Sequence, residues 1–106
     1  MELESYGFVL LRRGPRAHDY DDAELDRLQA AHLAHLDAMR AQGKLLVAGP
    51  FSDQPDETLR GLCVYACDLE ETRALAESDP SVRAGRMAVD VMTWWTLPGA
   101  LRFGDA

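Results

Sequence analysis

Residues 59–67 read LRGLCVYAC, and this stretch decides the fold. Its positions are apolar on both sides of an extended chain: Leu59, Gly61, Cys63, Tyr65 and Cys67 on one, and Leu62, Val64 and Ala66 on the other. Because successive side chains of a strand point to opposite faces, the pattern predicts a strand with apolar groups to bury on both faces. Asp68, with Glu71 three residues later, then predicts a helix over roughly 69–77.

Turn residues and caps delimit the other elements outward from this strand. Gly14-Pro15 ends an early strand, Asp21 or Asp22 caps a long helix, and Gly43 is its natural C-terminal stop. The expected elements are strands at 6–13, 44–48, 59–67 and 87–97, and helices from 22 to about 40 or 42 and at 69–77.

The resulting order, β-α-β-β-α-β, predicts an α+β, ferredoxin-like fold with two helices on one face of a four-stranded antiparallel sheet. We expect a single domain over 1–106, with a core at about 6–97 and a short C-terminal extension at 98–106. Two helices cover only one face, so the other apolar face predicts a homodimer through the sheet. Trp94 and Trp95 alternate across the last strand, so one indole is expected in the core and the other at the dimer interface.

Charge and cysteine content exclude several classes of partner. Eleven Lys and Arg against eighteen Asp and Glu give a net charge of −7, which repels nucleic-acid phosphates and anionic lipid surfaces. The basic cluster Arg12, Arg13 and Arg16 is too small for a nucleic-acid footprint. The N-terminal MELES does not fit a secretory signal, and no apolar run has membrane-spanning length. With Cys63 and Cys67 interpreted as free thiols, we expect a cytoplasmic protein.

His32 interrupts the apolar stripe of the long helix, which consists of Leu25, Leu28, Leu36 and Met39. An imidazole at such a position needs a hydrogen-bond partner or a cavity. The residues alone favour a core histidine donating to a backbone carbonyl over a catalytic one. His35 falls at the edge of the stripe and His18 in a polar loop. No third ligand stands at a metal-binding spacing, so no metal site is predicted.

Asp79 allows two interpretations. Before Pro80 it is a helix N-cap with proline at the first helical position, which is a structural role. Its carboxylate could instead orient an imidazole and stabilise the protonated form, giving a general acid/base pair. The two roles compete for the same oxygens.

Several segments occur together along nearly the whole chain: FVLLR at 8–12, AHL at 31–33 with Leu36, GKLLVAGP at 43–50, LRG at 59–61, SDP at 78–80 and AG at 84–85. With them the chain resembles the YCII-related (YciI-like) family of small bacterial proteins, in the dimeric α/β-barrel superfamily. The resemblance implies that His32 and Asp79 are the family's characteristic pair, between the sheet and the long helix. It implies a protomer that dimerises through its sheet. A few members of the family act as lyases or dehydrochlorinases on ring compounds, and the superfamily includes muconolactone isomerases. Ser81 departs from the aromatic residue frequent at that position.

The resemblance favours a site over a passive core histidine. One hypothesis is a cofactor-independent lyase, isomerase or dehydrochlorinase, with His32 as general acid or base and Asp79 orienting it. In this hypothesis Arg12, Gly49 and Pro50 contact an anionic or carbonyl-bearing small substrate. The sequence has no nucleophile motif, phosphate loop or cofactor fingerprint, so no cofactor is expected. The alternative is a small-molecule-binding or regulatory dimeric module without catalysis.

Overall fold

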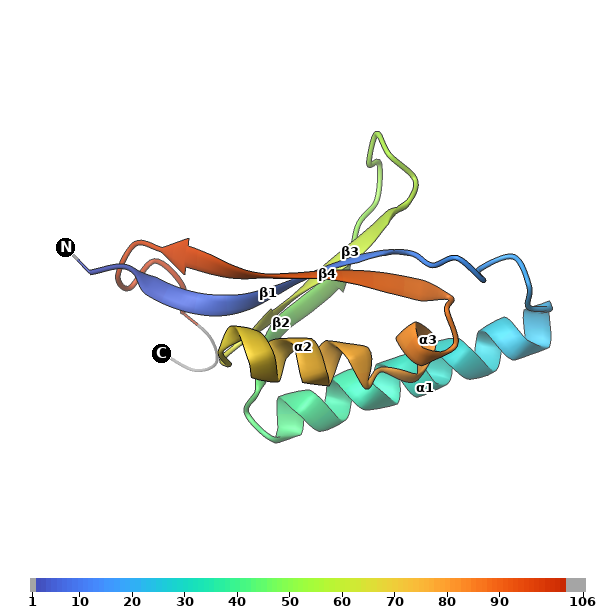
Figure 1. The fold of residues 1–106 in the computed structure, drawn as a ribbon, viewed down its shortest axis with the longest axis horizontal. Helices are drawn as coiled ribbons and strands as arrows, with labels where there is room; N and C mark the ends of the chain where they lie inside the picture. Colours follow the sequence, from blue (N-terminus) through green and yellow to red (C-terminus); the bar gives the residue numbers. More distant parts are fainter. Residues whose placement is uncertain (1, 103–106) are drawn as a thin grey trace.

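The computed structural model describes residues 2–102 and contains four strands and three helices within them (Figure 1). Met1 and the last part of the expected C-terminal extension, 103–106, lie outside the described residues. The elements are β1 (Glu4–Arg13), α1 (Asp22–Ala41), β2 (Leu45–Pro50), β3 (Leu59–Tyr65), α2 (Leu69–Glu77), α3 (Pro80–Arg83) and β4 (Met87–Thr96). The element order predicted from the sequence is confirmed, with α3 added as one short turn of helix.

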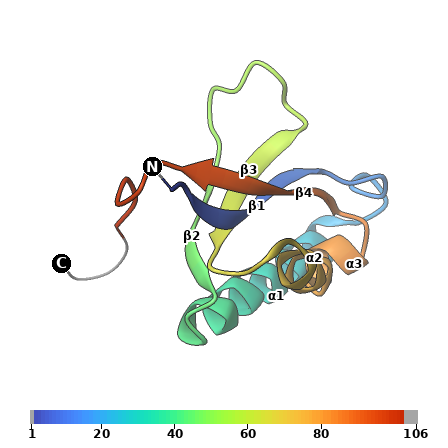
Figure 2. The same ribbon diagram turned by 60° about the vertical axis from the view of Figure 1, so that its left-hand side comes forward.

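The strands form one sheet in the order β2-β3-β1-β4, and every neighbouring pair is antiparallel. All three helices lie on the same face of this sheet, which leaves the other face open (Figures 1 and 2). This arrangement confirms the α+β, ferredoxin-like fold.

Hydrogen-bonded caps set the position of each helix. Asp21 and Glu24 form a reciprocal capping box at the start of α1, and Gly43 takes φ 74° just after its end. Asp79 caps α3, with Pro80 as the first residue of the helix. None of the helices within residues 2–102 is both long enough and apolar enough to cross a lipid bilayer.

The core fills the space between the sheet and the helices. Its buried side chains are Val9, Leu11, Met39, Leu45, Cys63, Tyr65 and Ala76. The expectation of a tryptophan in this core is wrong. Trp95 shares a sheet face with Val91, yet 59% of it is exposed, because the paired ends of β1 and β4 extend beyond the helices (Figure 1). Trp94 points to the open face.

A close approach of α2 to β1 fixes how the helices sit on the sheet. Gly7 of β1 faces Thr72 of α2, whose side chain is fully buried. A Cβ atom at Gly7 would lie 1.8 Å from the Oγ1 atom of Thr72. The helix therefore packs against bare backbone at this point. Because α3 follows α2 directly, the same contact helps to place Asp79.

Gly7→Ala is expected to lower the free energy of unfolding by about 1–3 kcal/mol, since the added methyl group overpacks a buried contact. Urea denaturation followed by circular dichroism measures the change. Gly49→Ala is the matched control, because a Cβ atom there meets nothing within 4 Å. Equal stability of the two variants would contradict the importance of this contact.

Candidate active site

The structure brings His32 and Asp79 into contact. His32 comes from the middle of α1 and Asp79 from the start of α3, 47 residues later. The Nδ1 atom of His32 lies 2.5 Å from the Oδ2 atom of Asp79. Both residues are buried, with 6% and 3% of their surfaces exposed. The capping box of α1 sets the helix register that turns His32 inward.

Asp79 fills both roles that the sequence left open, because its two carboxylate oxygens divide them. Oδ1 accepts hydrogen bonds from the backbone N–H of Ser81 at 2.9 Å and from the Ser81 hydroxyl at 2.8 Å. Oδ2 remains for the imidazole of His32. The cap therefore holds the carboxylate in place and does not compete with the histidine.

The hydrogen bonds of Asp79 determine which histidine nitrogen carries a proton. Burial alone raises the pKa of this carboxyl, but the hydrogen bonds from His32 and Ser81 outweigh burial, so the pKa lies below its usual value. An ionised carboxylate only accepts hydrogen bonds, so Nδ1 of His32 must be the donor. In a neutral imidazole the lone pair is then on Nε2, which has no hydrogen-bond partner among the described residues.

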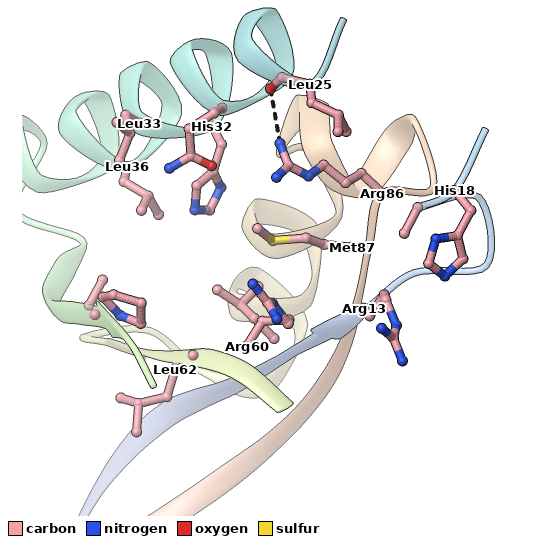
Figure 3. A pocket seen from close by; sticks show the side chains of 17 residues that line it. Arg13, His18, Leu25, His32, Leu33, Leu36, Arg60, Leu62, Arg86 and Met87 are labelled. Carbon is pink, nitrogen blue, oxygen red and sulfur yellow. Dashed lines mark hydrogen bonds between the residues drawn. The ribbon is translucent and has the colours of Figure 1, made fainter. Parts of the chain in front are cut away.

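His32 opens onto a pocket of about 450 Å³ between α1 and the helix-covered face of the sheet (Figure 3). Such a volume suits a small organic molecule. Leu25 and Leu36 of α1 and Met87 of β4 give the wall an apolar character. The predicted residues Gly49 and Pro50, at the end of β2, also form part of the wall.

Arg12 lies away from this pocket. It points to the open face of the sheet, where its Nε atom pairs with Asp90 of β4 at 2.6 Å. The neighbouring residue Arg13 lines the pocket instead, because adjacent strand residues face opposite sides. The sequence did not reveal which arginine faces the pocket. Leu10 and Leu11 are both apolar, so the pattern of apolar and polar residues along β1 does not identify the inward face.

Four further polar pocket residues were missed by sequence reasoning: Arg60, Arg86, His18 and Gln29. They come from separate parts of the chain, and no spacing along the sequence signals that they share a cavity. His18 was interpreted as a solvated loop residue. It is exposed, and it also lines the pocket.

Among the described residues, the remaining chemistry-bearing side chains do not form a second site. Burial raises the pKa of the Cys63 thiol to about 12, so it is not a nucleophile at neutral pH. The Nε2 atom of His35 is buried without a hydrogen-bond partner in the described part of the chain, outside the pocket wall. Within residues 2–102, no three His, Cys, Asp or Glu side chains form a group that could hold a metal ion.

The fold and this buried pair define a small α+β protein whose helix-covered sheet face carries an imidazole–carboxylate pair beside a cavity. The sequence model of the YCII-related domain matches residues 8–95, and the chain belongs to that family. No curated protein matches the sequence.

Among solved structures, the fold is similar to 5-chloro-2-hydroxyhydroquinone dehydrochlorinase from Burkholderia phenoliruptrix AC1100, in complex with 2,5-dihydroxybenzoquinone. The TM-score is 0.56 and the sequence identity 25%, over 83% of this chain and 92% of that chain.

Asp79→Asn is expected to lower the free energy of unfolding at pH 7 by about 1.5–3 kcal/mol, the range for hydrogen bonds to a charged group. The pKa of Asp79 is depressed in the folded protein, so its contribution is present above the usual value of 3.8 and is lost as the pH falls through the lower folded value. The stability difference between wild type and variant should therefore shrink in acid.

Urea denaturation across a pH series tests this linkage. Asp37→Asn, which alters an exposed acid on the same long helix, is the control and should change stability by less than about 0.5 kcal/mol. A difference between wild type and Asp79→Asn that stays constant down to acid pH would contradict the assigned role.

Proposed function

We propose that the protein is a cofactor-independent enzyme of the lyase, isomerase or dehydrochlorinase type, with His32 as general acid/base and Asp79 as its orienting partner. One observation carries the proposal: His32 is bound through Nδ1 to a buried carboxylate while its ring lines a pocket of about 450 Å³. A passive core histidine needs no cavity beside it.

The chemistry follows from the protonation of the pair. Nε2 of His32 takes a proton from a substrate carbon, so a C–H bond breaks and an N–H bond forms. The released electron pair either expels a leaving group from the neighbouring carbon or moves a double bond. The imidazolium that forms is stabilised by the Asp79 carboxylate. In an isomerisation, Nε2 returns its proton to another carbon.

The similar dehydrochlorinase supports this reaction class, since the loss of hydrogen chloride needs a base and a departing chloride. The six-membered ring bound to that protein is of a size that suits the pocket described here. Gly49 and Pro50 form the wall against which the substrate packs. Arg12 has no contact with this space, since it lies across the sheet.

His32→Gln is expected to lower turnover by roughly 10²- to 10⁴-fold, the usual contribution of a general base. The assay incubates the protein in D₂O with single-ring phenols, quinones and lactones, including 5-chloro-2-hydroxyhydroquinone. It measures chloride release and deuterium incorporation into carbon by mass spectrometry. His35→Gln, one helical turn further on and outside the pocket wall, controls for disturbed packing and should keep the wild-type rate.

Wild-type rates in a folded His32→Gln variant would contradict the enzymatic role. A compound that raises the melting temperature, yet is recovered chemically unchanged and without deuterium, would instead support a binding module without catalysis.

We also propose that the open sheet face pairs with the same face of a second copy. This face carries Val47, Met92 and Trp94, each about two-fifths exposed. Trp94 stacks edge-on against Phe8 of β1, with 6.0 Å between ring centroids. Exposed apolar side chains of this size on one side of a sheet favour burial against a second surface.

Trp94→Glu is expected to convert a dimer of twice the 11.8 kDa chain mass into a monomer, since it buries a charge in the interface. Sedimentation equilibrium measures the mass. Trp95→Glu makes the same change on the opposite face and should leave the dimer intact. A wild-type protein that stays monomeric at high micromolar concentration would refute the pairing.

We further propose a cytoplasmic location. Both cysteines are free, and Cys63 is buried. Free thiols are typical of a reducing compartment.

A further inference from the structure

The pocket wall has a charge opposite to that of the protein. The whole chain carries a net charge of −7. The pocket is nevertheless lined by Arg13, Arg60 and Arg86, and none of its lining residues is an Asp or a Glu. None of the three arginines forms an ion pair within residues 2–102. Positive charge is thus concentrated beside His32 without a protein counter-charge in the wall.

Arg86 is held in a fixed position next to the catalytic pair. One terminal nitrogen of its guanidinium donates a hydrogen bond to the backbone carbonyl of Leu25 in α1 at 2.9 Å. Its backbone N–H bonds to the carbonyl of Ser81 in α3 at 3.0 Å. Arg86 therefore contacts both helices that supply His32 and Asp79. A guanidinium has five N–H donors, so this single bond leaves most of them free for a ligand.

The geometry of α1 brings this guanidinium toward the imidazole. Leu25 and His32 are seven residues apart, so they lie on one side of the helix, separated by about 10 Å along its axis. Helical side chains lean toward the N-terminus, and the ring of His32 thus leans toward the turn that Arg86 contacts. Figure 3 shows Arg86 reaching α1 from just before β4, with Arg60 on the sheet side of the same space.

Arg60 and Arg13 supply the rest of the positive charge. Arg60 stands near the start of β3 and makes one long hydrogen bond, of 3.4 Å, to the backbone carbonyl of Glu57. Arg13, at the end of β1, lowers the pKa of Asp56 at a distance, after the larger effects of hydrogen bonds from Thr58. Arg60 and Arg86 are the stronger candidates for ligand contacts, because hydrogen bonds to backbone carbonyls hold their guanidinium groups at the pocket wall.

We infer that this pocket selects small organic anions, with Arg86 and Arg60 binding the anionic oxygens and the apolar wall holding the carbon skeleton. The inference rests on the proposed function, because it names the substrate class of the same site. Guanidinium groups match the planar, two-oxygen geometry of a carboxylate or of neighbouring ring oxygens. The same charges also stabilise the negative charge that develops on oxygen when His32 removes a proton from carbon.

Three ring compounds of nearly equal shape test the charge preference: benzoate (−1), benzamide (0) and benzamidine (+1). Isothermal titration calorimetry at pH 7.5 and low salt measures their dissociation constants. Benzoate should bind at least about tenfold more tightly than benzamide, the effect of one charge-assisted hydrogen bond. Benzamidine should bind most weakly, and added salt should reduce only the benzoate affinity.

Arginine variants locate the preference in the pocket. Arg60→Gln and Arg86→Gln should each weaken benzoate binding about tenfold and leave benzamide binding unchanged. Arg27→Gln makes the same charge change on an exposed part of α1 and should alter neither constant. Should Arg86→Gln unfold through loss of its bond to Leu25, Arg60→Gln decides the question alone.

Two results would overturn the inference. One is that benzoate binds no more tightly than benzamide or benzamidine, including the case in which none of the three binds. The other is that the folded pocket variants keep the wild-type affinity for benzoate. His32→Gln separates this inference from the proposed reaction. Charge-selective binding that survives in this variant supports the anion site whatever the reaction, and if the wild-type protein also shows no turnover, only the catalytic proposal is refuted.

Discussion

The carboxylate of Asp79 joins the long helix α1 to the short helix α3, which lie far apart in the sequence. Its Oδ1 atom caps the start of α3 by accepting the backbone N–H of Ser81, and its Oδ2 atom contacts His32 on the long helix. Both contacts stabilise the ionised form, which is why the pKa of the carboxyl falls although it is buried. The orientation of the imidazole, and with it the lone pair facing the pocket, depends on this one group.

The fold was predictable because local signals agreed with one another. The capping residues Asp21 and Asp68 mark the helix starts that the structure shows, and Gly43 marks the end of α1. Strand ends were less certain. The strand at 59–67 ends at Tyr65, and the one at 44–48 continues to Pro50. Whether a residue at the end of a strand belongs to the strand depends on its backbone hydrogen bonds to the neighbouring strand, and the sequence does not show these bonds.

The site was only partly predictable, for a physical reason. His32 stood out because an imidazole on an apolar stripe needs a partner, and Asp79 because it precedes Pro80; the pairing of the two came from the family resemblance. The pocket arginines carried no such signal, since an arginine is ordinary on a surface. Arg60 and Arg86 can be recognised as candidate site residues only in the folded chain, where β3, α1 and the start of β4 surround one cavity. The choice between Arg12 and Arg13 needed the strand register, which places Val9 and Leu11 inward.

The segment from Asp79 to Arg86 holds both the acid of the pair and an arginine of the proposed anion site. The backbone bond from Arg86 to Ser81 sets the path of this segment, and it is independent of the side chain at position 86. Substitution of that side chain during evolution would change the ligand charge that the cavity prefers, while the carboxylate of Asp79 stays in place. Within eight residues, the side chain proposed to select the substrate can therefore change without moving the carboxylate proposed to assist the reaction.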